Sequence, residues 1–151
     1  MDPLRWMLDV NIILDVLLNR QPYVAEAKLV WAACNEDKIK GYISSSSLQN
    51  IFYLSRLIRK RELGYSPEDA FREALNDVRV CMLTFTVVWL NEGIMQAALT
   101  NPGNDLEDAL VAQCTIKLLL DGLVTRDNKF RSSGALVLSL ADALAQIKQL
   151  S

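Results

Sequence analysis

The chain has 151 residues, the length of one ordinary domain, and 51% of them are apolar, so a core without disulfide bonds is expected. It contains no histidine, which excludes His-ligated zinc, Ser-His-Asp triads and imidazole acid–base catalysis. The net charge of −2 argues against holding nucleic acid by bulk attraction, although a nuclease whose metal neutralises its own carboxylates stays open.

The same composition predicts the cellular compartment and the assembly of the protein. Three widely spaced cysteines, with no CxxC pair, predict the reduced and buried thiols of a cytoplasmic protein. Charged and amide residues interrupt every long apolar run, so we expect no membrane span, and the N-terminus has no signal-peptide pattern. The slightly positive mean hydropathy of +0.14 predicts that a second subunit covers part of the apolar surface, as in a homodimer.

The first part of the chain alternates short apolar runs with segments of helical periodicity. In chain order we expect a strand over residues 5–8, a helix over 12–18, a helix over 22–37, a strand over 39–43 and a helix from 48 to about 64. Pro22 suits the first turn of its helix, because an N–H at that position would have no partner within the helix. Ser44–Ser47 is typical of a strand-to-helix turn in which a serine caps the helix.

The second part of the chain continues this alternation. The expected elements are a helix over residues 67–77, a strand over 80–86, helices over 89–99 and 105–120, strands over 123–125 and 136–138, and a helix over 140–150. Ser66 and Pro67 form a clear helix start, and Asn101–Asn104 forms a strong turn. This alternation predicts a single α/β domain over residues 1–151, with a mostly parallel sheet and helices on both faces.

Four aspartates fall where such a sheet binds ligands, beyond the carboxyl ends of its strands. Asp9 ends the first strand, Asp127 lies just past a later one, and Asp105 and Asp108 occupy the first turn of a helix. Each has a purely structural interpretation, because aspartate also favours helix caps and turns. Turn residues have no reason to share one edge of a sheet, however, so the four together predict an acidic pocket.

An acidic pocket needs a cation, because carboxylates that are brought close together repel one another. Hard divalent ions with oxygen ligands, Mg²⁺ or Mn²⁺, suit this set best. Such an ion lowers the pKa of a bound water and stabilises charge on a phosphate. Hydrolysis of a phosphodiester, which needs no histidine, is therefore the predicted chemistry.

Three segments of the sequence resemble the motifs of PIN domains. Met7–Asp15 is similar to the opening motif, in which an aspartate ends the first strand, while Asp105–Ala112 is similar to the third acidic motif and Val124–Asp127 to the fourth. Their order and spacing agree along nearly the whole chain, and the resemblance is to the stand-alone bacterial PIN proteins, similar to VapC-type toxins. It implies an α/β/α sandwich, Mg²⁺- or Mn²⁺-dependent cleavage of single-stranded or structured RNA, a homodimer, and an antitoxin protein as partner.

The resemblance also implies roles for individual residues. Asp9, Asp108 and Asp127 correspond to metal ligands. Asp105, one helical turn before Asp108, corresponds to an auxiliary acid that completes the catalytic set. Asn11 is expected to orient a ligand or a water molecule.

One position departs from the PIN pattern. PIN domains usually carry a glutamate in the helix after the second strand, and Asn50, with Gln49 beside it, stands where this glutamate is expected. Because amides coordinate metals weakly, three outcomes stay open: the site holds one metal loosely, uses Asp105 as a substitute, or is inactive. The alternative to a ribonuclease is therefore a PIN-fold protein with impaired catalysis that binds RNA or a protein.

Basic residues form two clusters outside the acidic motifs. One lies on the third predicted helix and the other follows the strand at 123–125, and the candidate nucleic-acid contacts are Arg56, Arg59, Lys60, Lys129 and Arg131. Both clusters could hold a phosphate backbone or the acidic tail of an antitoxin. The alternative is a solvated face, which is what runs of charge usually form.

Two other families with aspartate-centred sites fit the sequence less well. A phosphotransfer receiver domain needs a phosphoacceptor aspartate after its third strand, and residues 81–86 contain none. A haloacid-dehalogenase-like phosphatase needs a second aspartate two positions after the first, where this chain has Asn11.

Overall fold

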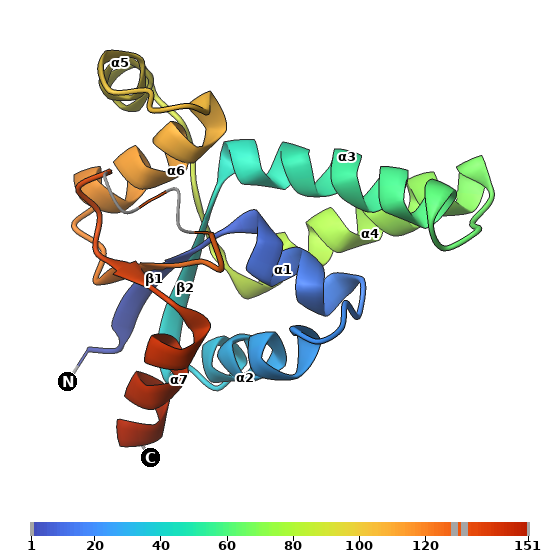
Figure 1. Cartoon of the computed structure of the whole chain (residues 1–151), viewed down its shortest axis with the longest axis horizontal. Helices are drawn as coiled ribbons and strands as arrows, with labels where there is room; N and C mark the ends of the chain where they lie inside the picture. Colours follow the sequence, from blue (N-terminus) through green and yellow to red (C-terminus); the bar gives the residue numbers. More distant parts are fainter. Residues whose placement is uncertain (1, 128–129, 131–132, 151) are drawn as a thin grey trace.

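The computed structural model in Figure 1 describes residues 2–127, 130 and 133–150. Within these residues, five strands form one sheet in the order β3-β2-β1-β4-β5, and every neighbouring pair runs parallel. The strands are β1 (Leu4–Leu8), β2 (Ile39–Ser44), β3 (Thr86–Val88), β4 (Gly122–Val124) and β5 (Val137–Leu138). The prediction of a parallel sheet is thereby confirmed.

Helices cover both faces of the sheet (Figure 1). They are α1 (Val10–Leu17), α2 (Val24–Asn35), α3 (Ser45–Arg61), α4 (Pro67–Thr84), α5 (Glu92–Thr100), α6 (Leu106–Lys117) and α7 (Leu140–Gln149). On one face, α5 and α6 pack over Met7, Tyr42 and Leu123. The opposite face is covered by α1, α2 and α7, and a hairpin of α3 and α4 extends this layer. The α/β/α sandwich expected from the sequence is therefore present.

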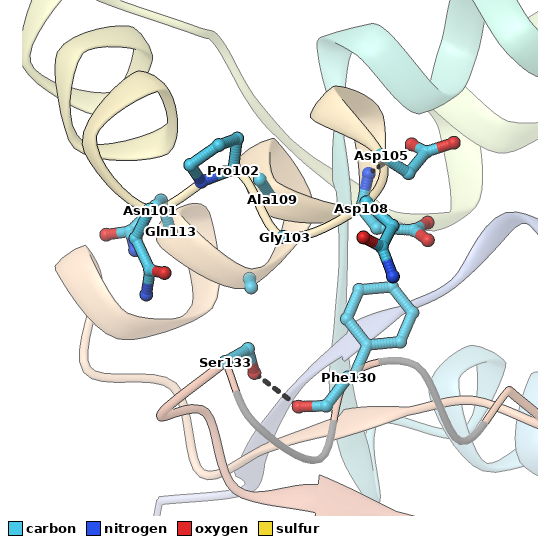
Figure 2. Close-up of a pocket in the computed structure, with 11 residues that line it drawn as sticks. Asn101, Pro102, Gly103, Asp105, Asp108, Ala109, Gln113, Phe130 and Ser133 are labelled. Atoms are coloured by element: carbon cyan, nitrogen blue, oxygen red, sulfur yellow. Dashed lines mark hydrogen bonds between the residues drawn. The ribbon is translucent and has the colours of Figure 1, made fainter.

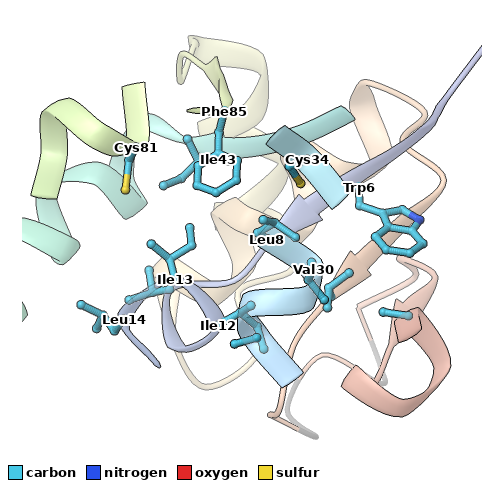
Figure 3. Close-up of a cluster of buried hydrophobic side chains, with 14 of the residues drawn as sticks. Trp6, Leu8, Ile12, Ile13, Leu14, Val30, Cys34, Ile43, Cys81 and Phe85 are labelled. Atoms are coloured by element: carbon cyan, nitrogen blue, oxygen red, sulfur yellow. The ribbon is translucent and has the colours of Figure 1, made fainter. Parts of the chain in front are cut away.

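The alternation of side chains along each strand separates two cores. In β1, Trp6 and Leu8 point into the core under α1 and α2, whereas Met7 points into the core under α5 and α6. The first core is the larger, and Figure 3 shows Ile12 and Ile13 of α1 among its members. Because β1 is buried on both faces, its carboxyl end has a fixed position in the molecule.

The prediction of a strand over residues 80–86 is wrong. Helix α4 continues to Thr84, and the strand that follows comprises only Thr86–Val88. Buried residues recur at helical spacing along α4, which packs against α3, and they are Ala70, Ala74, Asp77 and Cys81. This packing outweighs the preference of the last side chains of the helix for a strand.

Two differences near the N-terminus have local causes. Helix α1 begins at Val10, two residues earlier than predicted, because Asp9 is its N-cap. The prediction that Pro22 opens the second helix is wrong, since residues 21–23 form a turn and α2 begins at Val24.

Other predictions agree with the structure. Ser44 caps α3 by accepting a hydrogen bond from the Ser47 N–H at 3.0 Å. The turn at residues 101–104 joins α5 to α6 (Figure 2). Among the described helices, none has the length and apolar character that crossing a membrane requires.

The three cysteines are buried as free thiols, as the sequence predicts. Burial raises the thiol pKa to about 12 for Cys34 and Cys81 and to about 11 for Cys114. Thiols of this kind behave as small apolar side chains rather than as nucleophiles.

Candidate functional site

The candidate site lies where the strand order of the sheet changes direction. From β1, the chain adds β2 and β3 on one side and later β4 and β5 on the other. Parallel sheets bind ligands at such a switch point, outside the carboxyl ends of the two central strands. Asp9 directly follows β1, and Asp127 comes shortly after β4. The Asp9 N–H donates to the carbonyl of Val124 at 3.0 Å, which joins the two strand ends.

Asp9 is a buried carboxylate with two fixed hydrogen bonds. Its Oδ1 accepts from the Val10 N–H at 2.8 Å, and its Oδ2 accepts from the Thr125 hydroxyl at 2.7 Å. Only 7% of Asp9 is exposed, and this burial raises its pKa above the ordinary value. The two hydrogen bonds oppose the pKa shift, and the nearby charge of Asp127 adds to it. Each carboxylate oxygen keeps a further lone pair, so capping α1 and binding a cation are compatible.

Thr125 connects Asp9 to Asp127, a role that sequence reasoning missed. Its hydroxyl donates to Asp9 Oδ2 and accepts from the Asp127 N–H at 2.9 Å. Thr125 is buried, so water does not compete strongly for these bonds. One hydroxyl therefore fixes the Asp9 carboxylate relative to the backbone at Asp127. The signal that could have indicated this residue is its place in the fourth motif, two positions before Asp127.

The start of α6 carries two more of the predicted acids. Asp105 is the N-cap, because its Oδ1 accepts from the Asp108 N–H at 3.0 Å. Asp105 is exposed and Asp108 half-buried, and Figure 2 shows both carboxylates projecting to the same side of the helix start. The capping interpretation of Asp105 is thus confirmed. The cap uses only one of its two carboxylate oxygens, so Asp105 keeps acceptor capacity for the site.

Glu107, between these two aspartates, is a further acid that sequence reasoning missed. It is half-buried, and its Oε2 accepts from the side-chain amide of Asn50 at 2.6 Å. Burial raises the pKa of Glu107, and the hydrogen bond from Asn50 opposes that shift. The same pKa is raised further by the charges of Asp9, Asp105 and Asp108. Glu107 therefore stands within electrostatic reach of three of the four predicted acids.

A buried ion pair holds the segment that carries Asp127. Asp15 of α1 is fully buried, and its carboxylate accepts from Arg126 Nε at 2.7 Å and from Arg20 Nε at 2.9 Å. A second bond, from Arg126 Nη2 at 3.0 Å, makes the Arg126 contact bidentate. The residue before Asp127 is thereby tied to the helix that Asp9 caps.

Asn11 lies in the first turn of α1 and is half-buried. Its Oδ1 is buried and, within the described part of the chain, has no hydrogen-bond partner. Such an acceptor is costly unless something satisfies it. Its place two residues after Asp9 suits the predicted role in orienting a ligand or a water, which stays a prediction.

A pocket of about 230 Å³ opens beside the start of α6 (Figure 2). Its lining combines the acids Asp105 and Asp108 with amide side chains from the α5–α6 turn and from α6, namely Asn101, Asn104 and Gln113. The pocket therefore offers carboxylate and amide groups to a polar ligand next to the acidic site.

The basic cluster predicted on α3 is smaller than the sequence indicates. Arg59 is buried and pairs with Asp77 of α4 at 3.1 Å, so its expected place on a solvent-facing patch of α3 is wrong. Lys60 is exposed, and the Arg56 guanidinium lies 5.5 Å from the centroid of the Phe71 ring. The remaining predicted contacts, Lys129 and Arg131, lie outside the described residues.

The donor set suits a hard divalent cation, because it consists of carboxylate oxygens with amide oxygens nearby. Burial is the main cause of the raised pKa values of Asp9 and Glu107, and such an ion would relieve the repulsion from neighbouring carboxylates that adds to it. Among the described residues, however, no three acidic or thiol side chains are drawn together into a group that could hold a metal ion. Metal binding by Asp9, Asp108 and Asp127 therefore stays a prediction.

Solved structures of bacterial toxins share this fold. The VapC20 toxin of Mycobacterium tuberculosis, described as cleaving the sarcin–ricin loop, matches with a TM-score of 0.67 at 13% identity, over 87% of this chain and 96% of that one. A toxin–antitoxin complex from Klebsiella pneumoniae gives 0.61 at 20% identity, over 89% and 96%. VapBC2 from Rickettsia felis, bound to a DNA fragment from its promoter, gives 0.58 at 17%, over 90% and 98%. At these identities the likeness establishes the fold alone.

The sequence itself gives a family assignment. Comparison with curated proteins finds no match. A protein-family profile described as PIN domain does match, over residues 5–129. This stretch includes all of β1 except Leu4, the strands β2 to β4, and all four predicted acids. The chain therefore belongs to the PIN domain family, as its three sequence motifs predict.

Proposed function

We propose that this protein is a metal-dependent endoribonuclease of the PIN type and the toxin of a toxin–antitoxin pair. The observation that carries the proposal is the place of the acids in the fold: Asp9 follows β1 and Asp127 follows β4 at the switch point of the sheet, and Asp105 and Asp108 lie at the start of α6. Membership of the PIN family and the toxins of the same fold support it.

Asp9, Asp108 and Asp127 would hold Mg²⁺ or Mn²⁺, with Asp105 as an auxiliary acid. When bound, the ion supplies a water of lowered pKa and positive charge at the scissile phosphate. Asp9 presents a carboxylate whose orientation is set in advance by its bonds to Val10 and Thr125. Preorganisation of this kind spares the reaction the cost of ordering the site.

The pocket beside α6 supports RNA as the substrate. Its amide side chains, from Asn101, Asn104 and Gln113, can hydrogen-bond to base edges and sugar hydroxyls of a single strand. Arg56 and Lys60 remain candidate contacts to the phosphate backbone from α3.

An antitoxin and a second copy of the chain are the proposed protein partners. The structures of the same fold include a toxin–antitoxin complex from Klebsiella pneumoniae. Large apolar side chains stand exposed on α3, on α4 and just after β3, among them Tyr53, Phe71, Met82 and Trp89. Exposed apolar groups of this kind suit a protein interface. The buried free thiols are in keeping with a cytoplasmic location.

The test compares wild type, Asp9→Asn and Asp142→Asn on a mixed RNA pool, with Mn²⁺ and with EDTA. Asp142 is an exposed first-turn acid of α7 and serves as the control. Wild type and the control should cleave only with Mn²⁺. Asp9→Asn should lose more than about 100-fold in rate, because a direct ligand matters more than the outer partners whose loss costs 10–100-fold. Cleavage that survives both EDTA and Asp9→Asn would contradict the metal mechanism.

The alternative is a PIN-fold protein with impaired catalysis that binds RNA or a protein. Asn50 favours it, because an amide is a weaker metal ligand than a carboxylate. A wild-type protein that retains RNA in a binding assay, cleaves none of it and takes up no Mn²⁺ would support this alternative.

A further inference from the structure

We infer that Arg20 and Arg126 form a phosphate-binding subsite at the carboxyl edge of the sheet, which holds a backbone phosphate of the RNA next to the scissile one. The inference rests on the proposed function, because it names a substrate contact of that site. Its basis is a cluster in which both arginines bind the buried carboxylate of Asp15.

Two cations share one anion in this cluster. The Asp15 side chain has no exposed surface, and it accepts hydrogen bonds from Nε and Nη2 of Arg126 and from Nε of Arg20. One arginine is enough to compensate a buried aspartate. The second arginine therefore leaves the cluster with a positive charge that Asp15 does not neutralise, and this charge can attract an anion.

Both guanidinium groups keep donors that the cluster does not use. The bonds to Asp15 and to the Asn11 carbonyl engage Nε and Nη2 of the two arginines. In the described part of the chain, Nη1 of neither arginine has a hydrogen-bond partner. The side chains of Arg126 and Arg20 are 25% and 32% exposed, so a ligand can reach them. Guanidinium donors match the oxygens of a phosphate.

Arg126 is held in one orientation. Its bidentate contact with Asp15 fixes the plane of the guanidinium, and the ring of Tyr23 covers one face, with Arg126 Cζ 3.7 Å from the ring centroid. A long side chain ordinarily loses conformational entropy when it binds a ligand. Folding has already imposed that loss on Arg126, so it can bind an anion at a lower entropic cost.

The cluster lies at the edge of the sheet that carries the predicted acids. Arg126 stands between Thr125, whose hydroxyl donates to Asp9, and Asp127. Arg20 donates to a backbone carbonyl in the first turn of α1, the helix that Asp9 caps. An RNA strand whose scissile phosphate lies at Asp9 and Asp127 would therefore bring a neighbouring phosphate toward the arginines. Their positive charge would offset the repulsion between the acids and the strand.

Binding of a short single-stranded RNA of mixed sequence to the full chain, measured by fluorescence anisotropy in EDTA, tests the subsite. Arg20→Gln should weaken binding by about tenfold, because it removes one charge-assisted contact. The dependence of log Kd on log salt concentration should become shallower by about 0.7, the value for one phosphate of a single strand. Arg20→Lys keeps the charge and should bind within about threefold of wild type.

Arg5→Gln is the matched control. Arg5 is also half-buried, donates to the Tyr42 hydroxyl at 3.0 Å and lies 5.3 Å from the centroid of that ring. It belongs to the amino-terminal half of β1, however, away from the edge that carries Asp9. Arg5→Gln should keep the RNA affinity and the salt dependence of wild type. Thermal unfolding checks that each variant is folded.

The outcomes separate this inference from the proposed function. Wild-type affinity and salt dependence in Arg20→Gln would overturn the subsite, even if wild type cleaves RNA with Mn²⁺. Weakened binding in Arg20→Gln, in a protein that cleaves no RNA, would support the subsite and contradict the nuclease. No binding of RNA by wild type would overturn the subsite.

A poly-glutamate peptide is the second probe, because an acidic protein segment could also bind arginine. Loss of affinity for this peptide in Arg20→Gln, with unchanged affinity for RNA, would overturn the assignment to a phosphate. Arg126→Gln should weaken RNA binding as Arg20→Gln does. If Arg126→Gln does not fold, Arg20→Gln decides the question, since Arg126 still compensates Asp15 in that variant.

Discussion

Replacing Asp15 with asparagine tests how the segment that carries Asp127 is held. The Asp15 side chain has no exposed surface, whereas Arg126 and Arg20, its two partners, are 25% and 32% exposed. An asparagine of the same shape keeps one oxygen acceptor but turns an NH₂ group toward guanidinium N–H groups. Asp15→Asn therefore removes the ionic attraction and opposes donor to donor.

The cost in stability follows from the unequal burial of the partners. Removing one member of a fully buried ion pair costs about 3–5 kcal/mol, because the other charge is left uncompensated. Here the remaining charges belong to arginines that water partly reaches, so the expected loss is smaller, about 2–3 kcal/mol. In a domain of this length each kcal/mol lowers Tm by about 2–4 °C, so the Tm of Asp15→Asn should fall by about 4–12 °C.

Thermal and urea unfolding of the metal-free proteins measure this difference. Glu36→Gln is the matched control, because the Glu36–Lys38 ion pair has side chains that are 55% and 42% exposed. Breaking it should cost less than about 1 kcal/mol. A Tm for Asp15→Asn within about 2 °C of wild type, or equal losses in both variants, would refute the conclusion that a buried ion pair fastens Arg126 to α1.

Three further predictions concern other parts of the structure. With thiol pKa values of about 12 for Cys34 and Cys81 and about 11 for Cys114, ionisation increases only as the pH rises toward those values. At pH 8 at most about one thiol in a thousand is ionised at each of these cysteines. A disulfide reagent should therefore label the folded protein far more slowly than the urea-unfolded protein. Equal labelling rates would contradict the burial of the thiols. Ser44→Ala removes the buried cap of α3 and should lower the free energy of unfolding in urea by about 1–2 kcal/mol. Ser139→Ala, at the exposed cap of α7, should lower it by less than about 1 kcal/mol. A larger loss in Ser139→Ala than in Ser44→Ala would contradict this order. Light scattering at about tens of micromolar protein should give a homodimer, and a monomer there would count against it.

Features of the fold that depend on neighbouring residues could be predicted from the sequence. The apolar run that ends at Asp9 specifies a buried strand followed by a capped helix, and Asp105 begins a helix by the same logic. Strand ends in a parallel sheet share one edge, so the place of Asp9 and Asp127 after strands that end at that edge follows from their positions in the chain. The order of the strands is not a local property. The direct contact between the ends of β1 and β4 therefore had to come from the structure.

Features that depend on distant partners were missed or mistaken. Val80 and the residues after it favour a strand, and only the packing of α4 against α3 keeps them helical. Arg59 looks like a surface residue until Asp77, which lies on a different helix, pairs with it. Glu107 looks like an ordinary first-turn acid, because nothing in its own segment reveals a partner on α3. In each case a contact across the fold overrides the preference of the local sequence.

The sheet order also has a consequence for synthesis of the protein on the ribosome. Thr125, which fixes the Asp9 carboxylate, lies 116 positions after it in the chain. Strand β1, which Asp9 directly follows, can pair with β2 early, but its contacts with β4 form only after this long segment has been translated. Closing so long a loop is also slow, because chain entropy is lost before the contact forms. Under the proposed function, a growing chain has no assembled nuclease site, so translation itself delays toxicity until residue 127 has emerged.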